Sequence, residues 1–173
     1  MAHPLITQLR FTRSEFHRSV KNVSVKDGKT RILPMNCLGW NVGHLAWQEQ
    51  RYFLFFRLGN YLYPEIQAEF AFGSPASTPS IKEMLEKWTK ITEEIDPWLD
   101  TLTTAILSKQ IIIDGKESSK TYGNLIQRTI YHYWYHLGEN MAIRQQLGHK
   151  DLPIFVGNID SNAPYIPESS TSL

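Results

Sequence analysis

The feature that most constrains the fold of this chain is an apolar stripe of helical period over residues 80–108. Apolar or aromatic side chains recur there at steps of three and four residues, with one threonine among them: Ile81, Leu85, Trp88, Thr92, Ile95, Leu99, Leu102 and Ile106. This spacing lines one face of a helix, and other elements must cover such a face. The stripe therefore predicts a long helix packed against further helices.

The sequence also marks the start of this helix and a weak point within it. Ser80 and Glu83 have the spacing of a capping box, which satisfies free N–H groups of the first turn. Pro97 lacks an N–H group, so we expect a kink or a brief break between Asp96 and Trp98. Because the stripe resumes in phase beyond the proline, residues 80–108 are predicted to form one element.

Three further segments show helical periodicity. The first runs from Pro4 to about Lys21, the second from Cys37 to about Leu58, and the last from a cap at Thr121 to Leu147. We expect Asn36 to cap the second helix and Gly148 to end the last one in the left-handed conformation. With almost no alternating strand pattern, these segments predict an all-α four-helix bundle.

The connections between the helices are rich in Pro, Gly and Ser. Residues 21–34 are predicted to be a loop with one turn of its own, and residues 111–120 a short extended piece with a turn. Residues 60–80 are long for a connection inside one domain, which points to a functional or crossover loop. The tail from Lys150 is predicted to be an extended strap that frays after Pro167.

Composition narrows the classes of function. The chain has 173 residues with 18 Lys and Arg against 17 Asp and Glu, so we expect one domain over residues 1–173 with a net charge of +1. This balance argues against nucleic acid and anionic membranes as partners. A single cysteine, Cys37, allows no internal disulfide, and the first residues do not resemble a secretory signal, so a cytoplasmic protein is expected.

The last predicted helix carries a candidate metal site. His132 and His136 are four residues apart, which places both imidazoles on one face about one turn apart. The same arithmetic brings Glu139 onto this face, and Arg128 and Thr129 onto the same stripe. The helix is apolar or aromatic around much of its circumference, so it is expected to be buried with these polar groups directed inward.

The second predicted helix holds a third histidine, His44, with Trp40 and Asn41 on its face. Three imidazoles from two helices would leave a coordination position open, as in catalytic rather than structural zinc sites. A metal held in this way lowers the pKa of bound water or thiol, or polarises a carbonyl. Cys37 lies two turns before His44, too far to share its metal easily, and is expected to be a plain buried cysteine.

Other interpretations of these residues remain open. An HxxxH pair is common by chance, and a buried histidine often only hydrogen-bonds a neighbour. His3, His17 and His149 lie near a terminus, on a surface helix and past a helix end, so they are not expected to be ligands. Glu49 and Gln50 are predicted to face solvent or a partner helix.

The segments GWNVGHLAWQEQRYF and YHYWYHLGENMAIRQQLGH resemble those of the DinB-like superfamily of metal-dependent proteins. The resemblance covers essentially the whole chain, and its specific part is a histidine on the second helix followed by HxxxH and a Gly-Glu or Gly-Gln pair on the last. Here these are His44, then His132 and His136, then Gly138 and Glu139. The superfamily includes bacterial thiol-dependent S-transferases and mycothiol-dependent maleylpyruvate isomerases.

The resemblance implies an up-down-down-up four-helix bundle, often a homodimer, that binds one divalent metal through His44, His132 and His136. Zinc is the expected ion because three imidazoles suit it, with nickel or iron as alternatives. Family activities use the metal to activate a low-molecular-weight thiol such as mycothiol or bacillithiol. The isomerases differ in having a carboxylate where this sequence has His132.

The resulting hypothesis is a metal-dependent enzyme that activates a thiol or water for S-transfer to, or hydrolysis of, a small molecule. Glu139 is expected to orient a ligand or carry a proton, and Trp40, Asn41 and Arg128 to lie near the pocket. The alternative is a non-enzymatic bundle that binds a structural metal or a small ligand, or that only dimerises. A bundle without metal, whose three histidines are hydrogen-bonded in the core, is the third possibility.

Overall fold

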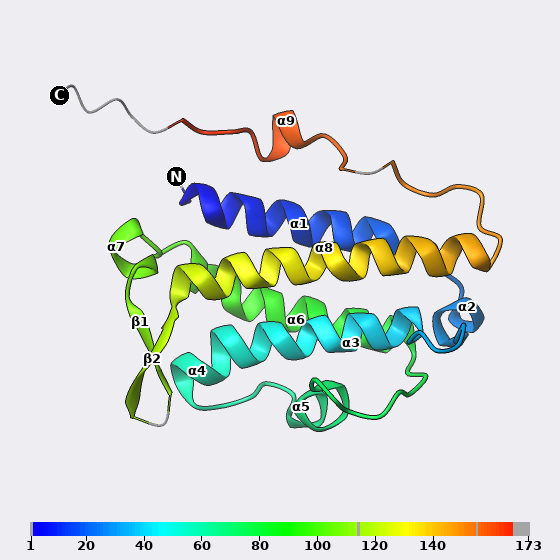
Figure 1. Cartoon of the computed structure of the whole chain (residues 1–173), viewed down its shortest axis with the longest axis horizontal. Coiled ribbons are helices and arrows are strands. Elements are labelled where there is room, and N and C mark those ends of the chain that lie inside the picture. The colour runs from blue at the N-terminus through cyan, green and yellow to red at the C-terminus, as the bar shows by residue number, and fades with distance from the viewer. Residues whose placement is uncertain (1, 114, 155, 168–173) are drawn as a thin grey trace.

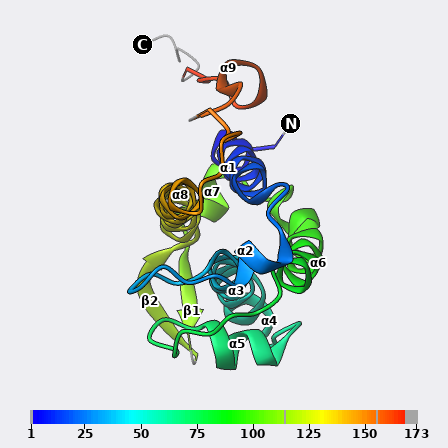
Figure 2. The same ribbon diagram turned by 90° about the vertical axis from the view of Figure 1, so that its right-hand side faces the viewer.

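Four long helices form the body of the protein (Figure 1). The computed structural model describes residues 2–113, 115–154 and 156–167. Seen end-on, the four helices stand at the corners of a square, in the order α1, α6, α3 and α8 (Figure 2). The long helices are α1 (Pro4–Val20), α3 (Leu38–Glu49), α6 (Ile81–Leu99) and α8 (Tyr122–Gln146).

The helices pack in two pairs whose members run in the same direction. On α1 and α8, the Phe16 and Tyr133 rings lie 5.2 Å apart, and further along both helices in the same direction Asn140 Nδ2 donates to Ser19 Oγ. Helices α3 and α6 also begin at the same end, because Gly39 lies against the start of α6 at Pro79. The two pairs run in opposite directions (Figure 1).

The caps predicted for two helices are confirmed. Ser80 Oγ accepts a hydrogen bond from the Glu83 N–H at 3.5 Å at the start of α6. Thr121 Oγ1 accepts one from the Asn124 N–H at 3.2 Å at the start of α8. After α8, Gly148 adopts a φ of +82°, which is the left-handed conformation predicted for that helix end.

The predicted helix over residues 37–58 is present, but its hydrogen bonding changes along its length. Helix α3 continues into a π-helix, Gln50–Phe55, and then into α4 (Phe56–Leu58), which ends at Gly59 with a φ of +74°. The cap predicted at Asn36 is wrong, because Cys37 occupies the N-cap position and makes no side-chain capping bond. The π-helical turn shifts the side chains that follow it relative to an uninterrupted α-helix.

The single helix predicted over residues 80–108 is also wrong. Helix α6 passes through Pro97 without a break, since the Asp100 N–H still bonds to the Asp96 carbonyl at 3.2 Å. It ends at Leu99, and a separate helix α7 (Thr104–Leu107) begins at a Thr103 cap. The apolar stripe stays in phase because both helices turn their apolar side chains into one core.

The connections contain short elements. Residues 21–34 hold α2 (Val25–Lys29), and the long connection over residues 60–80 holds α5 (Pro64–Phe70), a helix that the sequence analysis did not predict. The extended piece after α7 is an antiparallel hairpin of two strands, so the described part of the chain is mostly helical with one small sheet. The tail includes α9, and the fraying predicted after Pro167 falls on residues outside the described part. The two strands of the hairpin are β1 (Gln110–Ile113) and β2 (Lys116–Thr121), and the helix in the tail is α9 (Ile159–Asn162).

A buried ion pair joins the helices at the centre of the bundle. Arg13 of α1 donates to both carboxylate oxygens of Glu49 on α3, at 2.8 and 2.7 Å. Glu49 also accepts from the Tyr133 hydroxyl of α8 at 2.9 Å, and that hydroxyl accepts from the Trp88 indole of α6 at 2.6 Å. Arg13 further pairs with Asp96 on α6 at 2.7 Å. One connected network therefore touches all four long helices.

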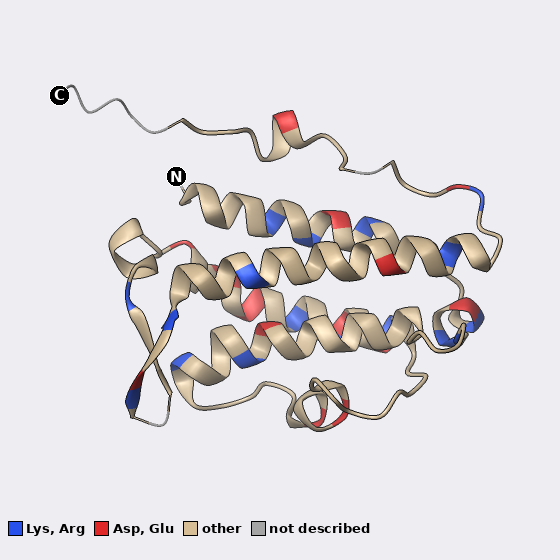
Figure 3. Ribbon diagram, in the orientation of Figure 1, with Lys and Arg blue, Asp and Glu red and all other residues tan. Residues whose placement is uncertain are grey.

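Glu49 and Gln50 are predicted to face either solvent or a partner helix. The solvent alternative is wrong, because both residues are 0% exposed. Glu49 is charged yet buried because Arg13 neutralises it and Tyr133 supplies a further hydrogen bond. The Gln50 amide is buried because it pairs with the backbone of Tyr63, accepting from its N–H and donating to its carbonyl. Figure 3 shows the remaining charges of both signs spread over the helices.

Removal of the buried carboxylate tests the importance of this network. The substitution Glu49→Ala leaves the Arg13 guanidinium buried with only the half-exposed Asp96 as a counterion. We expect the free energy of unfolding in urea to fall by about 3 to 5 kcal/mol. Glu93→Ala removes only an exposed pair with Lys90 and is expected to cost less than about 1 kcal/mol. Equal losses in the two variants would contradict a central role for the buried pair.

Candidate metal centre

Three histidines meet between α3 and α8. His44 lies in the middle of α3, and His132 and His136 lie one turn apart on the face of α8 that packs against it. One ring nitrogen from each histidine can be chosen so that all three lie within 4.8 Å of one another. His44 and His136 are only 5% and 6% exposed, while His132 is partly exposed. The group is therefore compatible with a metal site that opens toward solvent beside His132.

The His44 ring is fixed by a backbone group of α5. Its Nδ1 lies 2.7 Å from the carbonyl oxygen of Phe70, so Nδ1 carries the proton and donates it. The other nitrogen, Nε2, is then left with its lone pair for a metal. Helix α5 reaches this position because residue 43 is glycine; a Cβ at Gly43 would lie 2.7 Å from the Phe70 ring.

The His136 ring is fixed by a carboxylate. Its Nδ1 lies 2.7 Å from Glu139 Oε2 on the next turn of α8. Asn41 of α3 holds that carboxylate in turn, because its Nδ2 donates to Glu139 Oε2 at 3.0 Å and to Asn140 Oδ1 at 2.9 Å. Carboxylate–histidine pairs of this kind orient metal ligands and raise their basicity. His136 therefore also presents Nε2 to the group.

The spacing of the ring nitrogens suits a small divalent cation. His132 Nε2 and His136 Nε2 lie 3.0 Å apart. Two zinc–nitrogen bonds of about 2.0 to 2.1 Å at a tetrahedral angle would separate their nitrogens by about 3.3 Å. The remaining ring nitrogen of His132, Nδ1, is buried without a hydrogen-bond partner among the described residues. The donor set of three imidazoles thus fits a metal site with a position left open.

Burial keeps two of these imidazoles neutral. Desolvation lowers the pKa of His44 from its ordinary 6.5 to about 4. Desolvation, with the nearby rings of His136 and His44, lowers the pKa of His132 to about 3. Protons therefore compete weakly with a metal for these lone pairs at neutral pH.

Aromatic rings enclose the histidines. Trp40, four residues before His44, and Trp47, three residues after it, both stack on the His44 ring. Their ring centroids lie 4.8 and 5.1 Å from that of His44. The Tyr135 ring meets the edge of His136 at 5.2 Å. These contacts remove water from the rings and restrict their rotation, so the imidazoles are held in place before any ligand arrives.

The structure brings together most of the residues singled out in the sequence. Trp40 stacks on His44, Asn41 holds Glu139, and Glu139 holds His136. Arg128 is exposed on α8, one turn before His132, where it lines a hollow with Lys120. The Phe70 carbonyl was not anticipated, because a backbone acceptor leaves no signal in the sequence.

The other histidines and the cysteine have local partners. His17 stacks on Trp88 at 6.3 Å, and His149 accepts from the Arg144 guanidinium at 3.1 Å. Cys37 is buried and its thiol donates to the Ser77 carbonyl at 3.5 Å. Burial raises the pKa of the Cys37 thiol, which makes it less reactive.

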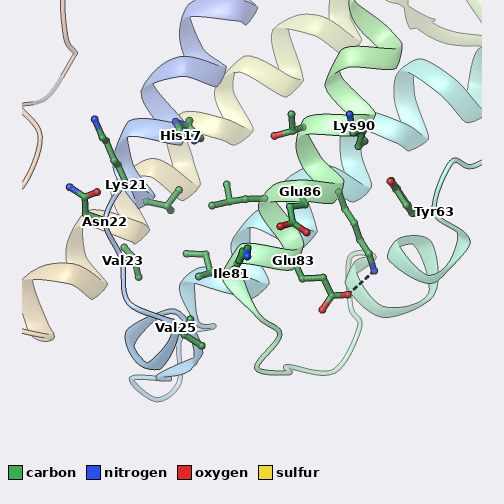
Figure 4. A pocket seen from close by; sticks show the side chains of 15 residues that line it. His17, Lys21, Asn22, Val23, Val25, Tyr63, Ile81, Glu83, Glu86 and Lys90 are labelled. Atoms are coloured by element: carbon green, nitrogen blue, oxygen red, sulfur yellow. Dashed lines mark ion pairs between the residues drawn. The ribbon is translucent and has the colours of Figure 1, made fainter.

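A cavity of about 930 Å³ lies away from the three clustered histidines, where the end of α1 and the start of α6 diverge (Figure 4). Its walls combine apolar side chains such as Val23 and Ile81 with charged ones such as Lys21 and Glu86. None of the three clustered histidines lines it. The cavity is therefore a separate feature from the candidate metal centre.

Comparison with known families agrees with this geometry. The sequence profile of the DinB superfamily matches residues 8–139, which is well over half of the chain and includes all three histidines. The chain therefore belongs to the DinB superfamily. A search of curated proteins found no match. Among the helices of the described residues, none is both long and apolar enough to cross a lipid bilayer.

The lowered pKa values make the stability of the metal-free protein depend on pH. In the unfolded chain His44 and His132 bind protons near pH 6.5, but in the folded chain only near pH 4 and 3. Acid therefore favours unfolding in the window between these values, by up to about 1.4 kcal/mol per pH unit for each of the two imidazoles. We expect urea denaturation in the presence of a chelator to show lower stability at pH 5 than at pH 7.

A variant separates this effect from other titrating groups. His132→Gln removes one of the two imidazoles, so the difference in unfolding free energy between pH 7 and pH 5 should shrink. An unchanged difference in this variant would show that His132 is not held neutral in the folded protein.

Proposed function

We propose that the chain binds one divalent metal ion through His44, His132 and His136 and uses it to activate a thiol or a water molecule. The observation that carries this proposal is the convergence of the three imidazoles, two of which are fixed through Nδ1 by Phe70 and Glu139. Zinc is the expected ion, with nickel or iron as alternatives, since imidazole ligands suit all three.

The chemistry that a bound ion would supply is a lowered pKa of thiol or water, or polarisation of a substrate carbonyl. The chain's own residues would bind the ion and position its ligands. Asn41 and His136 both contact Oε2 of Glu139, and the Glu139 side chain is 21% exposed. We assign Glu139 the role of holding His136 and of accepting a proton at its second oxygen. The reaction class is S-transfer to, or hydrolysis of, a small molecule.

The finer assignments drawn from the family resemblance are part of the same proposal. The parallel pairs α1–α8 and α3–α6 support an up-down-down-up bundle. A low-molecular-weight thiol is proposed as a cosubstrate, a homodimer as the assembly and the cytoplasm as the location. Trp40 and Asn41 are proposed as pocket residues because they contact the cluster. Arg128 would join them only if its long side chain turned toward the opening.

Metal content tests the proposal directly. Protein purified without a metal-affinity tag is expected to carry about one divalent ion per chain by elemental mass spectrometry. His44→Ala, His132→Ala and His136→Ala should each lose it. His17→Ala provides a matched control, because His17 is an exposed histidine that stacks on Trp88 outside the cluster, and it should keep the ion.

Reconstitution and activity decide between the outcomes. If the wild type takes up no stoichiometric zinc, nickel or iron, the metal site is wrong and the histidines serve packing. If it binds metal, thiol-transfer and hydrolase assays with the loaded protein follow. There Glu139→Gln should reduce turnover while keeping the ion, since a glutamine oxygen still accepts from His136.

The second candidate function is non-enzymatic binding of a small ligand. The cavity between α1 and α6 favours it, because its walls are partly apolar and include none of the three clustered histidines (Figure 4). Binding of an apolar fluorescent probe that persists unchanged in His132→Ala would support this function. Loss of probe binding in that variant would assign the probe to the metal centre instead.

A further inference from the structure

Two of the buried polar atoms that are without partners in the described part of the chain lie on His132 and on Gln48, which follows His44 by one turn. They are Nδ1 of His132 and Oε1 of Gln48. Gln48 is only 4% exposed. A buried polar atom left without a hydrogen bond costs about 1 to 3 kcal/mol, so such atoms require an explanation.

Helical geometry places Gln48 on the face of α3 that meets α8. Gln48 follows His44 by four residues, so it lies one turn further along nearly the same stripe. Asn41, which flanks this stripe, reaches Glu139 and Asn140 on α8. Because α3 and α8 run in opposite directions, one turn beyond His44 on α3 corresponds to the end of the cluster at His132, away from Glu139.

The neighbouring polar side chains of α8, Thr129 and Tyr133, already have hydrogen-bond partners, whereas Nδ1 of His132 has none among the described residues. The Thr129 hydroxyl donates to the Leu125 carbonyl at 2.9 Å, and the Tyr133 hydroxyl donates to Glu49 at 2.9 Å. Side chains on a helix also lean toward its N-terminus, which directs the Gln48 amide back toward the level of His44.

The tautomer of His132 determines what kind of partner it needs. His132 faces the cluster through Nε2, which lies 3.0 Å from His136 Nε2. A metal on Nε2 requires that nitrogen to be unprotonated, so the proton of the neutral ring moves to Nδ1. Nδ1 is then a buried donor, and Gln48 Oε1 is a buried acceptor. Their needs are complementary.

We propose that Gln48 is the positioning residue of His132: its amide oxygen accepts the Nδ1 proton of His132, directly or through one water, when a metal is bound. This inference rests on the proposed metal site and extends it. Each ligand then has its own acceptor: the Phe70 carbonyl for His44, the Glu139 carboxylate for His136 and the Gln48 amide for His132.

Another unpartnered acceptor, Asn41 Oδ1, fits this role less well. The Nδ2 group of Asn41 is bound to Glu139 and Asn140, which holds the amide at the far end of the cluster from His132. The unpartnered Trp40 Nε1 cannot accept a proton, because an indole N–H is a donor only.

Metal affinity tests the assignment without reference to any reaction. The zinc dissociation constant is measured by competition with a chromophoric chelator, for the wild type and for Gln48→Met, which keeps the side-chain length and removes the acceptor. We expect Gln48→Met to bind zinc about 10- to 100-fold more weakly. Gln48→Glu retains an acceptor and should bind at least as tightly as the wild type.

Gln50→Met is the matched control. It removes a neighbouring buried amide whose partner is the Tyr63 backbone, so it should lower stability without changing the zinc affinity of the folded protein. Two-dimensional NMR of ¹⁵N-histidine provides a second readout. A slowly exchanging His132 Nδ1 proton is expected in the zinc-loaded wild type, and faster exchange of that proton in Gln48→Met.

The outcomes separate the two proposals. A wild type that binds no zinc overturns the metal site and this assignment with it. A wild type that binds zinc while Gln48→Met binds equally well overturns the role of Gln48 alone. If Gln48→Met fails to fold, Gln48→Glu decides: weaker binding than in the wild type overturns the assignment, and equal or tighter binding with a protected Nδ1 proton supports it.

Discussion

The buried pair between Arg13 and Glu49 is the interaction on which the rest of the structure depends. It is surrounded by Tyr133, Trp88 and Asp96, so it sets the register of all four long helices at one level. Ion pairs in a core contribute little net stability compared with apolar packing, but they penalise every arrangement that separates them. The pair therefore specifies which packing of four amphipathic helices is adopted.

This register positions the candidate metal centre. Glu49 lies just over one turn from His44 on α3, and Tyr133 is adjacent to His132 on α8. A hydrogen bond between Glu49 and Tyr133 thus fixes, one turn away, the height at which His44 meets the histidines of α8. A sliding of either helix by one turn, about 5.4 Å, would break this bond and separate the imidazoles. The ion pair and the three clustered histidines therefore share the interface between α3 and α8.

The parts of the fold that follow from local chemistry could be predicted from the sequence. Helical periodicity and caps gave α1 and α8 nearly to the residue, and the turn after α8 followed from Gly148. The end of α6 at Leu99 could not be foreseen, because Pro97 is accommodated and the next helix begins from its own cap. The π-helical turn after α3 leaves the apolar pattern intact and so escapes a search for periodicity.

The candidate site shows the same division. Three histidines could be selected because spacing places two on one face, and the third lies in another strongly apolar helix, as the family resemblance also implies. Their partners depend on long-range packing. The Phe70 carbonyl reaches His44 from α5, a short helix within a connection rich in proline and glycine that predicts a loop. The choice between solvent and a partner helix for Glu49 could not be made from the sequence, because a lone carboxylate gives no sign of Arg13, which lies 36 positions away.

The distance along the chain between the two halves of the cluster has a consequence for folding. Asn41 and Glu139 are 98 positions apart, yet they are in direct contact beside the histidines. The three imidazoles can therefore come together only after nearly the whole chain has been arranged, and an unfolded or half-folded chain presents at most the HxxxH pair. A metal would therefore bind late in folding and stabilise the completed bundle. A free ion at 100 times its dissociation constant would add about 2.7 kcal/mol to the native state.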